Sequence, residues 1–121
     1  MKKIFFLMAV LLVTASVGAQ LTNTRWKVTL ALENPIDVIF SFKKDTVTAF
    51  YAIDNSVGEE MTYIATDTSF IIQKISGQSE CTVGSKGSYR FEIKEGYMYV
   101  KAVSDDCERR ATYLSAPWRK L

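Results

Sequence analysis

The sequence predicts an all-β fold, an eight-stranded antiparallel up-and-down barrel. Apolar and polar residues alternate along most of the chain, which is typical of strands with one buried face. Clusters of turn-forming residues interrupt this alternation roughly every seven to twelve residues, and no stretch shows helical periodicity. Short connections make successive strands neighbours in space, so eight strands can bury a shared apolar face and lose both sheet edges by closing. A β-sandwich, which needs longer crossing connections, is the alternative fold.

Each expected strand is bounded by residues that favour turns. Asn34-Pro35 and Lys44-Asp45 end the first two strands, turn formers fill residues 54–58, and Glu95-Gly96 permits a hairpin return. Pro117 is admissible at the start of a strand and unfavourable within one, so a short closing piece is expected there. The eight expected strands are residues 25–33, 36–43, 47–53, 60–66, 70–75, 89–94, 97–103 and 107–114.

Residues 1–19 have the features of a secretory signal peptide. Two lysines precede an apolar run from Ile4 to Val13, and small residues stand at the positions that a signal peptidase recognises. The run is shorter than the roughly 20 residues that an apolar helix needs to cross a bilayer. We therefore expect cleavage after Ala19, export to the periplasm or the extracellular space, and a single barrel domain formed by residues 20–121.

Charge is balanced in the expected mature chain. Of the fifteen basic residues, Lys2 and Lys3 belong to the signal segment, so thirteen remain against thirteen acidic residues. No block of lysine or arginine occurs in the sequence. A nucleic-acid partner or a membrane-binding basic face is therefore not expected, because both require a strong electrostatic footprint.

The two cysteines, Cys81 and Cys107, are expected to form a disulfide. They are an even pair in a chain expected to be exported, where thiols are oxidised by default. A redox or zinc site is the alternative, but the chain has no histidine and no Cys-x-x-Cys spacing. We expect no metal and no cofactor.

Catalytic chemistry finds little support in the sequence. Without histidine, a serine or cysteine nucleophile lacks its usual general base, and acid-base work would fall to carboxylates. Asp105-Asp106 is the one suggestive acidic pair, and neighbours of this kind usually cap or solvate a turn. We expect a protein that is not an enzyme.

From Asp105 to Trp118 the sequence resembles the C-terminal end of bacterial secreted lipocalin-like (calycin) small β-barrel proteins. Asp105, Cys107 and Arg110 match an Asp-x-Cys-x-x-Arg pattern, and Trp118 matches a terminal tryptophan. The resemblance implies a tryptophan on the first strand, which Trp26 matches, although Thr24 stands where the family has glycine. It also implies that an arginine near the last strand, here Arg110 with Arg109 as the alternative, lies across that ring and has a structural role.

An interior of this composition favours one small, mostly apolar ligand. Eight strands enclose a space that is either filled by side chains or able to hold one small molecule. Buried tyrosine hydroxyls need partners, so they would reach water or a polar group of a ligand. The alternative is a binding or inhibitor module with a filled core, acting through its loops, such as 54–58 or 78–87, on a protein or a glycan. The expected ligand-binding residues are Phe40, Phe42, Tyr51, Tyr63, Tyr89 and Phe91.

Overall fold

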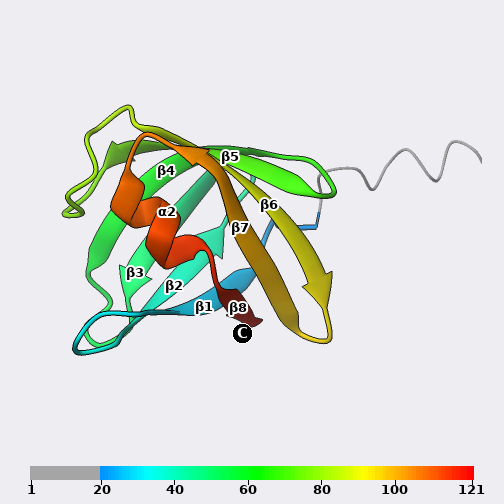
Figure 1. Ribbon diagram of the computed structural model, residues 1–121, viewed down its shortest axis with the longest axis horizontal. Coiled ribbons are helices and arrows are strands. Elements are labelled where there is room, and N and C mark those ends of the chain that lie inside the picture. Colours follow the sequence, from blue (N-terminus) through cyan, green and yellow to red (C-terminus); the bar gives the residue numbers. More distant parts are fainter. Residues whose placement is uncertain (1–19) are drawn as a thin grey trace, which may run out of the picture.

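The computed structural model describes residues 20–121 and shows a closed eight-stranded antiparallel barrel (Figure 1). The fold class predicted from the alternation is thus confirmed. Residues 1–19, the expected signal peptide, lie outside the described part. The elements are β1 Arg25–Leu30, β2 Ile36–Phe42, β3 Thr46–Tyr51, β4 Val57–Ala65, β5 Ser69–Ser76, β6 Lys86–Lys94, β7 Tyr97–Asp105, α2 Glu108–Leu114 and β8 Pro117–Lys120.

Every strand pairs with its successor, and β8 closes the barrel by pairing with both β7 and β1. Trp26 on β1 faces Lys120 on β8, and Met98 on β7 faces Trp118. The hairpin between β6 and β7 turns through Glu95 and Gly96, both with positive φ. Positive φ at both central residues gives the tight turn whose twist matches that of paired strands. The two-residue return expected from the sequence is therefore present.

The expected eighth strand at 107–114 is wrong, because this segment forms α2 and the eighth strand is the short closing piece, β8. In a helix, residues four apart share a face, and Arg110 and Leu114 are the two buried residues of α2. A helix of seven residues completes about two turns, too few for helical periodicity to be visible in the sequence. In Figure 1, α2 lies beside the loop at 77–85.

One end of the barrel is filled by large apolar side chains, and we call it the closed end. Trp26, Phe42, Phe70 and Trp118 are almost completely buried there. Leu21, which precedes β1, is also fully buried, and the backbone beside it is held by hydrogen bonds between Asn23 N and Phe42 O and between Phe42 N and Thr24 O. The segment before β1 thus covers this end of the core.

The expected contact between Arg110 and the ring of Trp26 is wrong. The cation over that ring is Lys120, whose Nζ lies 6.0 Å from the ring centroid, and the indole Nε1 donates to Thr24 Oγ1 at 2.8 Å. The reason is the helix: α2 directs Arg110 to carboxylates at the opposite end of the barrel, whereas β8 runs beside β1 and brings Lys120 to Trp26. A cation on the last strand does reach the first-strand tryptophan, but it is a different residue.

The disulfide between Cys81 and Cys107 is present, as predicted. It joins the loop at 77–85, the longest connection without a helix among the described strands, to the residue that precedes α2. The Cα atoms are 5.5 Å apart, within the usual range for a disulfide. Within residues 20–121, no helix is long and apolar enough to span a membrane.

Candidate functional site

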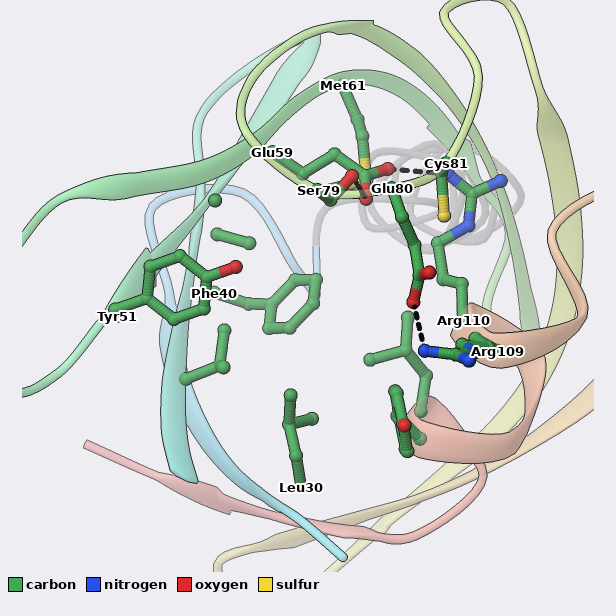
Figure 2. Close-up of a pocket in the computed structure, with 15 residues that line it drawn as sticks. Leu30, Phe40, Tyr51, Glu59, Met61, Ser79, Glu80, Cys81, Arg109 and Arg110 are labelled. Carbon is green, nitrogen blue, oxygen red and sulfur yellow. Dashed lines mark hydrogen bonds and ion pairs between the residues drawn. The ribbon is translucent and has the colours of Figure 1, made fainter. Parts of the chain in front are cut away.

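The end of the barrel opposite the closed end contains a cavity of about 140 Å³, and we call it the cavity end. Its walls come from β1 to β4, and the loop at 79–81 and α2 form the other side (Figure 2). An apolar cavity of about 150 Å³ holds one benzene-sized molecule, so the available space suits a single small ring. Cavities that hold larger ligands are usually about 300 Å³ or more.

The wall formed by the strands is apolar. It consists of alternate, inward-facing residues of β1, β2, β3 and β4, and the helix adds Tyr113 and Leu114. Gly58 leaves room for the Tyr51 ring, because a Cβ at Gly58 would lie 3.1 Å from Tyr51 Cζ. The strand residues of this wall are Leu30, Val38, Phe40, Ala49, Tyr51 and Met61.

The hydroxyl of Tyr51 is the polar group that the strands contribute to this wall and leave open to a ligand. Figure 2 shows it pointing into the cavity, across from Arg109. Among residues 20–121 it has no hydrogen-bond partner, and the Tyr51 side chain is half-buried. A phenol in this position can donate to or accept from a bound molecule.

Of the six residues expected to bind a ligand, the structure brings only Phe40 and Tyr51 to the cavity. The other four lie in the packed core. Phe42 and Tyr63 meet edge to face with ring centroids 5.0 Å apart, and Phe70 stacks on Tyr89 at 5.3 Å. Phe91 also packs against Phe70, with ring centroids 5.8 Å apart.

The two buried phenols have protein partners, which explains why they do not serve the cavity. The Tyr63 hydroxyl donates to the carbonyl oxygen of Lys43, and the Tyr89 hydroxyl donates to the carboxylate of Asp105. The prediction that buried tyrosines need partners was sound, but the partners are the chain's own polar groups rather than water or a ligand.

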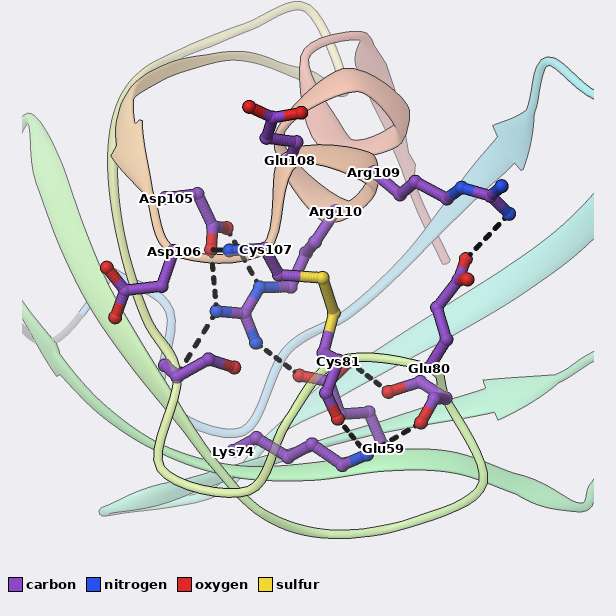
Figure 3. Close-up of a disulfide and its surroundings, with 12 residues drawn as sticks. Glu59, Lys74, Glu80, Cys81, Asp105, Asp106, Cys107, Glu108, Arg109 and Arg110 are labelled. Carbon is purple, nitrogen blue, oxygen red and sulfur yellow. Dashed lines mark hydrogen bonds and ion pairs between the residues drawn. A yellow bond between two sulfur atoms is a disulfide. The ribbon is translucent and has the colours of Figure 1, made fainter.

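Beneath α2, a buried charged network borders the cavity (Figure 3). The guanidinium of Arg110 donates to Asp105 through Nε and Nη2, both at 2.8 Å, and to Glu59 Oε2 through Nη1 at 2.5 Å. Nη2 also donates to the carbonyl oxygen of Ser85 at 3.2 Å. All three ionic side chains are more than nine-tenths buried. Two carboxylates on one guanidinium leave the network with a formal charge of minus one.

Burial and the neighbouring carboxylates shift the pKa values of Arg110 and Tyr89 in opposite or additive ways. Burial alone would lower the pKa of Arg110, but the hydrogen bonds and attraction of Asp105 and Glu59 outweigh it, and the pKa lies above its ordinary value. Burial, together with the Asp105 carboxylate, raises the pKa of the Tyr89 hydroxyl. Arg110 is therefore charged and Tyr89 protonated throughout the physiological range.

The loop at 77–85 is held by a second buried cation. Lys74 is 3% exposed, and its Nζ donates to the carbonyl oxygens of Ser79 at 2.8 Å and Cys81 at 2.7 Å. Ser79 Oγ in turn donates to Glu59 Oε1 at 2.8 Å. Both carboxylate oxygens of Glu59 thus accept hydrogen bonds from the protein, one from Ser79 and one from Arg110. This side of the cavity is polar, but its polar groups already have partners.

At the rim, Arg109 and Glu80 form an ion pair at 2.9 Å with both side chains mostly exposed. This pair joins α2 to the loop at 77–85 beside the disulfide, opposite Tyr51. The described residues contain no group of three or more His, Cys, Asp or Glu side chains able to hold a metal ion. The cavity is therefore a small apolar pocket with an ionic rim, and two tyrosine hydroxyls, those of Tyr51 and Tyr113, have no hydrogen-bond partner among residues 20–121.

Sequence reasoning missed Glu59 and Lys74, although a signal for both was present. Glu59 has the same parity as Met61 and Tyr63 on β4, and Lys74 has the same parity as Phe70 and Ile72 on β5. Because side chains alternate along a strand, a charge in register with a buried set must also point inward. Charges at inward positions need partners, and that requirement predicts a network of the kind observed.

Comparison with known proteins found no match for this chain among protein families, curated proteins or solved structures. The assignment of function therefore rests on the barrel and on the geometry of the cavity.

Proposed function

We propose that this protein is a secreted, lipocalin-like binding protein that holds one small, mostly apolar ring in the cavity end of its barrel. The observation that carries the proposal is the cavity itself: apolar walls from four strands, a volume of about 140 Å³, and the unpartnered hydroxyl of Tyr51 pointing inward. Binding sites commonly combine apolar walls with a few polar groups that fix orientation.

The chemistry of the walls selects the ligand class. Burying about 150 Å² of apolar ligand surface contributes about 4 kcal/mol, and a hydrogen bond to Tyr51 adds to it. A ligand with a single ring and one hydroxyl or carbonyl group can provide both the apolar surface and the hydrogen bond to Tyr51. Long acyl chains need more length than the cavity offers, because Phe42, Phe70 and Trp118 fill the barrel beyond it.

The resemblance to lipocalin-like proteins supports the proposal in two ways. The residues that carry it, Asp105, Cys107 and Arg110, surround the cavity end, and the closed up-and-down barrel is the fold that the resemblance implies. Export is part of the proposal, and the disulfide supports it because such bonds persist in oxidising compartments. Intact mass of the protein from its native compartment tests cleavage after Ala19.

The direct test is a titration with phenol and benzene, followed by protein NMR, together with native mass spectrometry of the secreted protein. We expect saturable shifts at Phe40 and Tyr51, with phenol binding more tightly than benzene. Tyr51→Phe should remove that preference and leave benzene binding in place, because it deletes only the hydroxyl. Tyr97→Phe, the same change on the outside of the barrel, is the matched control.

A second variant tests whether binding depends on the volume of the cavity rather than on the Tyr51 hydroxyl. Ala49→Leu adds volume to the cavity wall and should abolish binding of both probes. Absence of saturable binding by the wild-type protein, or unchanged binding in Ala49→Leu, would reject the proposed function.

A further inference from the structure

The outer surface of β6, β7, β8 and β1 carries two tyrosines that pack on each other. Tyr97 and Tyr99 point outward from β7 with 40% and 48% of their surface exposed, and their ring centroids are 6.2 Å apart at an angle of 33°. More than half of each residue's surface is covered, so the rings lie along the sheet. They present broad apolar surfaces edged by hydroxyl groups.

Strand register places cations on both sides of these rings. Arg119 on β8 and Lys94 on β6 are the direct cross-strand neighbours of Tyr97, and Lys27 on β1 is the neighbour of Arg119. With about 4.8 Å between strands, this row of four side chains extends for about 14 Å across the sheet. Along β7, the next outward residue after Tyr99 is Lys101, and it faces Arg90 on β6.

These cations are not neutralised by the chain. Lys94, Arg119, Arg90 and Lys101 are exposed, and none forms an ion pair within residues 20–121. Lys27 is the exception in its row, since Asp37 lies 4.0 Å away.

Two of the cross-strand pairs bring like charges together. Lys27 lies opposite Arg119, and Arg90 lies opposite Lys101. Like charges placed opposite one another destabilise a sheet, so this arrangement costs stability. Glu92, opposite Tyr99, is the one acidic residue between the pairs. The balanced total charge thus conceals a positive face, and a bound polyanion would relieve its repulsion.

We propose that this surface binds an acidic polysaccharide, with sugar rings on the two tyrosines and carboxylate or sulfate groups on the flanking cations. We call it the tyrosine–cation face, defined by Tyr97, Tyr99, Lys94, Arg119, Arg90 and Lys101.

Arginine suits this role because its planar fork binds carboxylate or sulfate through two hydrogen bonds, and Arg119 and Arg90 stand on opposite sides of β7. The disulfide favours a glycan over a nucleic acid, because it is typical of proteins outside the reducing cytosol. The partly covered rings favour a polymer lying along the sheet over a membrane, which needs apolar side chains that project into it. The face lies on the outer surface of the barrel, so its function is independent of the cavity.

Isothermal titration calorimetry with polygalacturonate at low ionic strength tests the proposal, with dextran as the neutral polymer. We expect binding to polygalacturonate and none to dextran. The double variants Tyr97→Ser/Tyr99→Ser and Lys94→Ser/Arg119→Ser should each weaken binding by about tenfold or more. The amide signals of Tyr97 and Tyr99 should shift on titration, a readout that a loss of stability alone does not produce.

Matched controls lie elsewhere on the barrel. Lys43→Ser/Lys44→Ser removes the same charge from an exposed turn, and Ile64→Ser/Ile71→Ser removes an exposed apolar cross-strand pair from β4 and β5. Both should bind as the wild type does.

Three outcomes overturn the proposal. The first is no binding to polygalacturonate, and the second is equal weakening in the Lys43→Ser/Lys44→Ser control, which would indicate unspecific attraction. The third is tighter binding to single-stranded oligo-dT or to vesicles containing phosphatidylglycerol, which would assign the tyrosine–cation face to a nucleic acid or a membrane.

Discussion

The closed end and the cavity end of this barrel are built from the same eight strands but held together by different forces. At the closed end, the rings of Phe42 and Trp118 pack against Phe70, Trp26 is buried as well, and burial of apolar surface stabilises the arrangement. At the cavity end, Arg110 gathers two carboxylates under a helix and the disulfide ties a loop to that helix.

The difference shows how a small barrel keeps an open space without collapsing onto it. Apolar side chains alone would move inward to fill a cavity, because interiors pack densely. The network around Arg110 fixes one side of the cavity through hydrogen bonds whose geometry does not allow that movement. Apolar burial stabilises the closed end, whereas ionic hydrogen bonds and the disulfide stabilise the cavity end.

The largest effect is expected from Arg110→Ala. This change leaves Glu59 and Asp105 buried without a cation, and it should reduce the free energy of unfolding by about 5 kcal/mol. Urea denaturation measures it. Arg109→Ala, which removes the neighbouring but exposed pair with Glu80, should cost less than about 1 kcal/mol. Equal effects of the two variants would mean that the buried network does not support the cavity end.

Trp26→Ala probes the closed end and should cost about 4 kcal/mol, mostly from lost burial and the cavity that remains. Denaturant melts measure the loss. Trp26 itself does not line the cavity, so phenol binding at low denaturant should be unchanged in this variant. A loss of binding without a loss of stability would show that the two ends are not separable.

Removal of the disulfide by Cys81→Ser/Cys107→Ser should cost about 3.5 kcal/mol in the chain-entropy model, since the bond closes a loop of 26 residues. The measurement is the urea midpoint of the variant against the oxidised wild type. Hydrogen exchange should show the additional opening in α2 and the loop at 77–85, with the amides of Phe42 and Phe70 as protected references. Uniform acceleration across both ends would contradict a local role of the bond.

The smallest effect concerns pH. The pKa of Tyr89 is raised by burial and by Asp105, so in the folded state the hydroxyl keeps its proton at a pH where the unfolded chain loses it. Stability from this group is complete below the ordinary tyrosine pKa of about 10 and falls above it, by at most about 1.4 kcal/mol per pH unit. Free energies of unfolding between pH 9 and 11 measure the slope. The free energy of unfolding of Tyr89→Phe should depend less on pH over this interval. An identical slope in the variant and the wild type would show that Tyr89 does not contribute to this pH dependence.

The sequence predicted the closed end better than the cavity end for a physical reason. Alternation is a local property, so β1 through β7, the hairpin at Glu95-Gly96 and the buried aromatic set followed from it. The network depends on residues far apart, such as Glu59 and Arg110, which are separated by 51 positions. No local pattern specifies that pairing, and the two-turn α2 that creates it is too short to leave a periodic signal.

The residues that line the cavity were predicted in part for the same reason. The parity rule identified which rings point inward, Phe40 and Tyr51 among them, but not the height of each ring in the barrel. Height depends on register and on the stagger of the strands. Alternation places Tyr97, Tyr99 and Lys101 on one face of a single strand, which permits a sugar-binding surface. It does not show the other cations of the tyrosine–cation face, because Lys94, Arg90 and Arg119 come from the neighbouring strands β6 and β8.

The closing strand β8 has only four residues, yet by pairing with both β1 and β7 it closes the barrel. The first strand, β1, therefore acquires its second neighbour, β8, only after all the other strands have been synthesised. During that interval β1 and β7 expose strand edges, and exposed edges are templates for pairing with other chains. During folding, closure of the barrel within one chain therefore competes with strand pairing between chains. Dilution or slow synthesis should favour closure within one chain.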